Sequence, residues 1–367
     1  MYDLGLDLES YTAAELQRAN TEARRKLAEV LLRSQNYRNV PLLLETEIRP
    51  FESLESILFQ AAKNNGMASV SPLLQALDLP RRGILNPKRH AQLGRSLQAE
   101  GDALAAAVPT APSVILPKGS VIYGGHCLRR DQLALTTSRV CPACVRESGY
   151  GRAWWALAPL AFCDIHGTAL LDQCPRCRSP ISMARPAYDT CSCGANLGAT
   201  LSTSCNLAHQ VLAQLVAARF KREPTPVRLE EQGFPARYLG ALGLSALLDL
   251  VKFGGALSPD QGTVRLRKLI GAVRLDHAAA GHARAARMLA DWPNGFYLEL
   301  RRARAFLPSS DTQYQVARSL DHIVQLATGS LRQPELQFVV AEIARFLQKP
   351  DEWNESRKEA ARKRLKS

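Results

Sequence analysis

The sequence predicts a mostly α-helical protein with small β modules near its centre. Two observations predict this class. Between Cys141 and Cys193, cysteine and histidine residues fall into four close pairs, a pattern typical of small modules held by side-chain ligands. On both sides of this block, apolar residues recur every three or four positions, the spacing of the buried face of a helix.

Shifts in composition predict five segments along the chain. A helical N-terminal domain covers residues 1–107, and a linker with its lead-in covers 108–140, of which residues 108–120 are rich in proline and small residues. The paired cysteines form tandem modules over 141–200, a helical C-terminal domain covers 201–350, and a basic tail covers 351–367.

The composition favours an anionic partner such as nucleic acid, because the 367 residues carry a formal net charge of +13. The first residues contain neither a basic segment nor an apolar run, so no secretory signal is visible. There is also no run of eighteen apolar residues, and we expect a cytoplasmic protein without a membrane span.

Four helices are predicted in the N-terminal domain. The first covers 12–33, and it packs on its own domain or pairs with a second copy. The second begins at Glu52 and ends at the Asn-Asn-Gly of residues 64–66, and Ser71 followed by Pro72 predicts the start of the third. These two form a helix-turn-helix-like unit, although any helical hairpin has the same pattern.

Basic residues flank the fourth helix, which is predicted to begin at Pro87, and others lie in the tail. The candidate contacts to nucleic acid or to a partner are Arg81, Arg82, Lys88, Arg89, Arg362, Lys363 and Arg364. A solvated helix face and a frayed tail explain the same residues nearly as well.

The four pairs predict two structural zinc ions. They are Cys141 with Cys144, Cys163 with His166, Cys174 with Cys177, and Cys191 with Cys193. A tight turn aims both members of a pair at one ion, and two such turns complete the tetrahedron that zinc prefers. Taken in order, they form a three-cysteine, one-histidine site and then a four-cysteine site, as two consecutive zinc ribbons. An interleaved grouping, in which alternate pairs share an ion, stays open.

Disulfides are the alternative, which the odd number of cysteines and the missing secretory signal disfavour. Because every ligand position is filled, the ions are expected to be structural. The aromatic residues between the pairs are expected to form a small core, although an exposed Trp could anchor a partner; they are Tyr150, Trp154, Trp155 and Phe162. Cys127 and Cys205, with His126 and His209 nearby, are expected to be single buried thiols.

Six further helices are predicted after Cys205, with prolines between them. They cover residues 207–220, 237–251, 263–289, 296–306, 314–327 and 335–347.

Several short motifs follow one another in a specific order. They are Glu52-Ser53 with Ser56 in a helix followed by Asn-Gly, the first Cys-Pro-x-Cys, Tyr150-x-Arg152-x-x-Trp155, Cys163-x-x-His166-Gly167 with Leu170, the second Cys-Pro-x-Cys, and Cys191-x-Cys193-Gly194. Together they resemble the TniQ/TnsD family of transposon target-selection proteins, and Asp291-Trp292-Pro293 with Phe296 is a weaker family feature. Members often have Trp and Arg at the positions of Ile57 and Gln60, and Gly at the position of Arg178.

The resemblance implies a non-catalytic adaptor and not an enzyme. Family members mark the insertion site and recruit an AAA+ ATPase regulator, which then engages the transposase. Some recognise a fixed DNA site directly. Others dock, often as a dimer, on a guide-RNA effector complex (Cascade) of a CRISPR-associated transposon. The resemblance therefore implies a protein of the bacterial cytoplasm that associates with the nucleoid when it is on target DNA.

Two hypotheses follow for this chain. Docking on a Cascade-type complex is favoured by the length of the chain and by the poorly basic third helix. Direct binding of a DNA attachment site is favoured by the net charge and the helical pair. A zinc hydrolase or nuclease is disfavoured, because the sequence supplies no activated nucleophile or clustered carboxylates.

Overall fold

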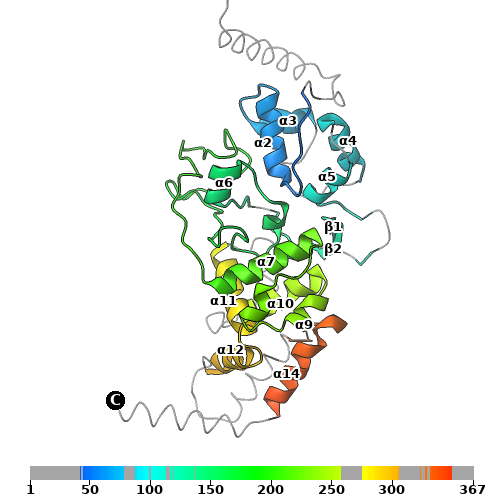
Figure 1. Ribbon diagram of the computed structural model, residues 1–367. Helices are drawn as coiled ribbons and strands as arrows, with labels where there is room; N and C mark the ends of the chain where they lie inside the picture. Colours follow the sequence, from blue (N-terminus) through cyan, green and yellow to red (C-terminus); the bar gives the residue numbers. More distant parts are fainter. Residues whose placement is uncertain are drawn as a thin grey trace, which may run out of the picture. The chain divides into compact units, whose positions relative to one another are not determined.

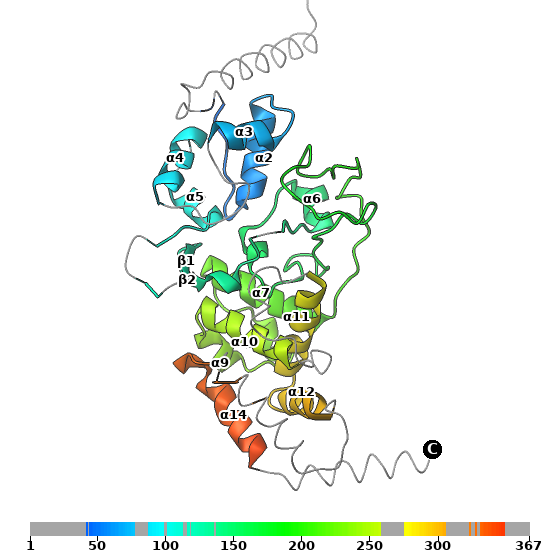
Figure 2. The same ribbon diagram turned by 180° about the vertical axis from the view of Figure 1, so that it is seen from behind.

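The structure is a computed structural model, shown from opposite sides in Figures 1 and 2. It describes residues 42, 44–77, 87–98, 101–112, 116–117, 119–135, 137–257, 275–305, 323, 327–328 and 331–348. The chain forms two compact units. Unit 1 comprises Met1–Gly125, Pro142–Ala153 and Asp172–Thr200, and unit 2 comprises His126–Cys141, Trp154–Leu171 and Leu201–Ser367.

Short helices make up most of the regular structure of unit 1. They are α2 (Leu54–Asn64), α3 (Val70–Ala76), α4 (Pro87–Leu97), α5 (Gly101–Ala107) and α6 (Pro142–Ser148). Ser53 is the N-cap of α2, since its side chain accepts a hydrogen bond from the Ser56 N–H. The apolar stripe of α2, which includes Ile57 and Leu58, is buried, and α2 packs against α3.

Asn65 ties the end of α2 to the segment that precedes the helix. Its Oδ1 accepts a hydrogen bond from the Leu44 N–H at 3.1 Å, and its Nδ2 donates to the Ala61 carbonyl at 2.9 Å. The side chain is buried. The Asn-Gly that marks the helix end in the sequence therefore also fixes the extended segment on the helix.

A small two-stranded sheet lies in the segment that the sequence predicts to be a linker and lead-in. It pairs β1 (Ser120–Tyr123) with β2 (His126–Arg129). The two residues between the strands, Gly124 and Gly125, both have positive φ, which a two-residue hairpin turn of this kind requires. Before the strands, Val108 is fully buried.

Helices dominate unit 2. They are α7 (Leu207–Lys221), α8 (Arg228–Glu231), α9 (Ala236–Ala241), α10 (Leu244–Ala256), α11 (Leu275–Leu289), α12 (Asn294–Ala305) and α14 (Gln337–Leu347). Short 3-10 turns are η2 (Arg130–Gln132), η3 (Ala153–Ala156) and η6 (Pro334–Leu336). Figures 1 and 2 both show α10 beside α11. The two helices approach so closely at Gly254 that an added Cβ there would lie 2.8 Å from the Cα of Ala285.

A buried carboxylate on α10 holds neighbouring segments of unit 2. Asp249 accepts hydrogen bonds from Arg129 at 2.8 Å, from Gln132 at 2.9 Å and from Gln333 at 2.9 Å. The residue is 4% exposed, so its charge needs these partners. This cluster joins β2, η2 and the residue before η6 to α10.

Most predicted helices that fall on described residues are confirmed, with three corrections. The third helix begins at Val70, not after Ser71. Pro72 therefore lies within its first turn, where the missing N–H of proline costs no hydrogen bond of the helix. The predicted helix over 237–251 is two helices, which separate at Leu242 and Gly243. The prediction for 335–347 holds from Gln337 onward, where η6 gives way to α14.

The predictions for 12–33, 263–274 and most of 314–327 lie outside the described residues. The structure is mostly helical, with a small two-stranded sheet and, as described next, two cysteine clusters.

Candidate metal centres

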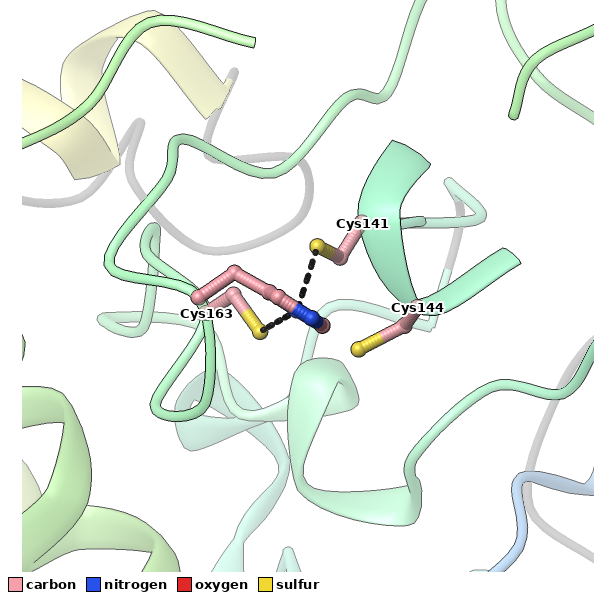
Figure 3. Close-up of side chains that lie close together, drawn as sticks. Cys141, Cys144 and Cys163 are labelled. Atoms are coloured by element: carbon pink, nitrogen blue, oxygen red, sulfur yellow. Dashed lines mark hydrogen bonds between the residues drawn. The ribbon is translucent and has the colours of Figure 1, made fainter. Parts of the chain in front are cut away.

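The predicted ligands gather into two clusters that could each hold a metal ion. The first contains Cys141, Cys144, Cys163 and His166, whose ligand atoms all lie within 4.8 Å of one another. Figure 3 shows the sulfur atoms of the three cysteines turned toward a common centre. Cys141 precedes α6 and Cys144 lies in its first turn, so the helix start presents both thiols together.

The distances in this cluster fit a zinc tetrahedron. Cys141 Sγ and Cys163 Sγ each lie 3.6 Å from His166 Nδ1. A tetrahedral ion with a Zn–S distance of about 2.3 Å and a Zn–N distance of about 2.0 Å sets an S···N edge of about 3.5 Å. Three thiols and one imidazole therefore fit zinc in both chemistry and spacing, and they fill all four corners.

Hydrogen bonds hold the loop that carries Cys163 and His166. The Gly167 N–H donates to the Cys163 carbonyl at 3.0 Å, and φ of Gly167 is +59°, a conformation that favours glycine. Trp154 Nε1 donates to the buried Asp164 carboxylate at 3.0 Å. Gln214 on α7 donates to the Asp164 carbonyl at 3.2 Å. These hydrogen bonds fix the Cys163–Gly167 loop within unit 2.

The second cluster contains Cys174, Cys177, Cys191 and Cys193, all in unit 1. The Sγ atoms of Cys174 and Cys193 lie 3.7 Å apart, and those of Cys177 and Cys191 lie 3.8 Å apart. A tetrahedral Zn(Cys)4 site sets S···S edges of about 3.8 Å, far longer than the ~2.05 Å of a disulfide. The ligands therefore group consecutively along the chain, and all nine cysteines are free thiols.

The turn after Cys174 explains one departure from the family pattern. The Arg178 N–H donates to the Cys174 carbonyl at 2.8 Å, which closes the turn around the two ligands. The φ of Arg178 is +59°, in the left-handed region that favours glycine. Gly194 fills the same role after Cys193, with φ of +81°. Arg178 thus keeps the turn at a position where glycine costs less.

Residues of the second cluster's loop also bind α2 within unit 1. Arg185 is 1% exposed, and its guanidinium pairs with Glu55 of α2 and donates to the Ser182 carbonyl at 2.9 Å. The same guanidinium lies 4.6 Å from the centre of the Phe59 ring. The sequence analysis missed Arg185, and its position within a loop gives no periodic signal that could have identified it.

The two clusters differ in exposure and in thiol chemistry. The three cysteines of the first are buried, whereas Cys177 and Cys193 of the second are exposed. Hydrogen bonds from Ser179 lower the pKa of Cys177 to about 6, and burial raises the pKa of Cys191 to about 12. A thiolate is the form that ligates metal, and the lowered pKa of Cys177 favours that form.

The expected aromatic core is confirmed for Trp154, Trp155 and Phe162, which are 4%, 2% and 8% exposed, while Tyr150 is half-buried. The expectation of buried thiols outside the clusters is wrong. Cys127 is exposed because it lies on the outer face of β2, and Cys205 is half-buried.

The histidines near these two thiols have other partners. His126 Nε2 bonds to the Phe220 carbonyl at 2.9 Å, and the His209 ring stacks on Phe162. Neither histidine belongs to a metal cluster among the described residues.

The first family motifs meet in one contact of unit 1. Glu52 is 1% exposed, and this burial raises the pKa of its carboxyl group. The carboxylate accepts hydrogen bonds from Ser56 Oγ at 2.5 Å and from the Arg49 N–H at 3.1 Å. The Ser53 N–H donates to the Gly151 carbonyl at 2.8 Å, which pairs this segment with Tyr150-Gly-Arg152. In unit 2, Trp292 of the weaker motif stacks on Phe296.

The candidate contact residues are only partly described. Lys88 on α4 is exposed and Arg89 is half-buried. The other candidates lie outside the described residues; they are Arg81, Arg82, Arg362, Lys363 and Arg364.

In the described part of the chain, every helix is too short or too polar to span a bilayer.

The comparison with protein families connects these features. The TniQ family model matches residues 43–170, which is less than half of the chain. The matched segment contains the Glu52 contact with Arg152 and all four ligands of the first cluster. No curated protein matches the chain. The family match agrees with the motifs, so residues 43–170 of the chain form a TniQ domain, which supports a protein of the TniQ/TnsD family.

Proposed function

We propose that this protein is a non-catalytic adaptor for transposon target-site selection, which docks on a Cascade-type RNA-guided effector complex and recruits an AAA+ ATPase regulator and, through it, the transposase. The observation that carries the proposal is the TniQ match over residues 43–170. A TniQ domain indicates an adaptor role in transposition. The protein would act in the bacterial cytoplasm, at the nucleoid when target DNA is bound.

The chemistry of the two clusters supports a docking role. In each cluster all four corners are taken by protein ligands, so a bound zinc ion would have no open position for water or substrate. Zinc held in this way stabilises the fold through its binding free energy. The clusters would therefore be two structural Zn2+ sites in consecutive zinc ribbons, with Cys141, Cys144, Cys163 and His166 in the first and Cys174, Cys177, Cys191 and Cys193 in the second.

The helical pair α2 and α3 supports docking more than base reading. In the proposed helix-turn-helix-like unit, α3 would be the helix that enters a major groove. Its sequence from Val70 to Ala76 contains no Arg, Lys, Asn or acidic residue, and Gln75 is its only long polar side chain. Base edges are read mostly by Arg, Lys, Asn and Gln. A protein surface is therefore the better partner for this unit.

Capture of purified partners tests the proposal. The zinc-loaded protein is expected to retain both an AAA+ ATPase regulator and a guide-RNA effector complex, in either order of addition. Capture of the ATPase without any capture of the effector complex would contradict Cascade docking. A homodimer, which we also propose, would appear as twice the chain mass in light scattering.

The second candidate is a TnsD-like protein that binds a DNA attachment site directly and recruits the same ATPase. The formal net charge of +13 favours it. Arg81, Arg82, Lys88, Arg89, Arg362, Lys363 and Arg364 would then contact phosphates of DNA, as they would contact guide RNA or DNA in the first case. Gel shifts at several salt concentrations separate the two: one duplex sequence bound tightly by the protein alone supports direct recognition, and weak binding to all sequences contradicts it.

A further inference from the structure

Two arginines of unit 1, outside both metal clusters, converge on one aromatic ring. The guanidinium carbon of Arg152 lies 3.9 Å from the centre of the Tyr150 ring, and that of Arg49 lies 4.9 Å from the same centre. Arg49 lies just before α2, and Arg152 belongs to the segment that pairs with Glu52. The fold of unit 1 therefore brings two cations from distant parts of the sequence close together.

The charges in this cluster do not balance. Among the residues that the structure describes, Glu52 is the carboxylate that faces both guanidinium groups, and Arg49 Nη1 lies 3.8 Å from its Oε1. This carboxylate is buried and already accepts hydrogen bonds from Ser56 Oγ and from the Arg49 N–H. Two cations thus share one carboxylate that has other partners, and an excess of positive charge is left beside Tyr150.

The cluster also has unused hydrogen-bond donors. Arg152 makes no side-chain hydrogen bond within the described residues, and its Nε is shielded from solvent without a partner. Arg49 donates to Gln60 Oε1 at 3.3 Å, and its side chain is 41% exposed. A guanidinium offers five N–H donors in a planar fork that matches phosphate oxygens. Solvent reaches the cluster through Arg49.

We propose that Arg49 and Arg152, held in place by Tyr150, form a binding site for a backbone phosphate of nucleic acid. The formal net charge of +13 favours nucleic acid over an acidic protein segment. The inference rests on the proposed function, in which DNA or guide RNA lies close to the adaptor. The phosphate is the shared chemistry of both polymers, and the experiment separates them.

The test uses the full-length, zinc-loaded protein in fluorescence anisotropy titrations. The probes are a duplex DNA and a single-stranded RNA of equal length, each measured at four salt concentrations. Arg49→Gln is expected to weaken binding to at least one probe about three- to tenfold and to reduce the slope of log K against log salt by about one. Arg49→Lys, which keeps the charge, is expected to keep the slope.

Control variants separate this site from general charge effects and from misfolding. Arg130→Gln removes an exposed arginine of unit 2 and is expected to leave affinity and slope closer to the wild type. Zinc content and melting temperature show whether each variant is folded. The same titrations of Arg152→Gln test the second arginine of the site. If Arg152→Gln does not fold, the result for Arg49→Gln decides the test.

Two results would overturn the phosphate site. The wild type could bind neither probe, or Arg49→Gln could bind both probes with unchanged affinity and slope. If, in the second case, Arg49→Gln also no longer captures the ATPase regulator, the cluster is a contact for a protein. Capture of the regulator by the wild type is measured separately, so failure of the phosphate site and failure of the adaptor role are distinguishable.

Discussion

The two metal clusters contain similar ligands in different surroundings. The cysteines of the first are buried, and its Cys163 loop is fixed by Trp154 and α7. The second exposes Cys177 and Cys193, and its loop binds α2 chiefly through Arg185. The comparison indicates that similar tetrahedra serve two purposes. The first cluster belongs to a buried core, and the second holds the surface loop whose Arg185 contacts α2.

The largest expected effect is the loss of a ligand from the first cluster. Cys163→Ser removes a fully buried thiol, and a structural zinc ion in small modules contributes about 10–16 kcal/mol to folding, as much as the whole stability of a domain. We expect a protein with less than one zinc per chain and reduced helical content in circular dichroism. The matched control is Cys177→Ser, which is expected to lose one ion and to keep its helices. Equal loss of helix in both variants would remove the distinction between the clusters.

The second expected effect is a difference in the rate of metal removal. Because two of its sulfur atoms are exposed, the second cluster should release zinc to a chelator well before the first. A colorimetric chelator should therefore show two phases of equal amplitude. The fast phase should be absent from Cys177→Ser. A single phase for both ions, or a fast phase that persists in this variant, would argue against the assignment.

The third expected effect concerns the contact that holds the second loop. Arg185→Met removes a buried cation and its ion pair with Glu55, which we expect to destabilise unit 1 by about 2–4 kcal/mol. Chemical denaturation followed by Trp fluorescence and by zinc release measures the loss. Glu55→Gln keeps a hydrogen-bond acceptor and should cost less. An unchanged denaturation midpoint in Arg185→Met would mean that zinc alone fixes the loop.

The smallest expected effect is a gain in stability. Arg178 has φ of +59°, and an L residue in this conformation costs about 1 kcal/mol relative to glycine. Arg178→Gly should therefore raise the stability of the second module by about that amount and slow its release of zinc. Arg176→Gly, two residues earlier, is the control, because Arg176 does not have positive φ. Faster zinc release from Arg178→Gly would mean that the arginine itself protects the site.

The sequence predicts the parts of this molecule that depend on local spacing. The eight ligands, the start and end of α2 and the span of α7 follow from short-range patterns. The hairpin of β1 and β2 was missed because its strands are only four residues long and Gly124-Gly125 lies within the segment interpreted as a linker and lead-in. Long-range contacts leave no such signal, which is why the Arg185–Glu55 pair and the Asp249 cluster appear only in three dimensions.

The claim that both clusters hold closed structural zinc is tested most directly by zinc K-edge absorption spectroscopy of the purified protein. The account predicts two zinc ions per chain that share seven sulfur ligands and one nitrogen ligand. The spectrum should then fit an average of between three and four sulfurs at about 2.3 Å and less than one nitrogen at about 2.0 Å. A protein without zinc, or a spectrum that requires a bound water at either ion, would contradict it.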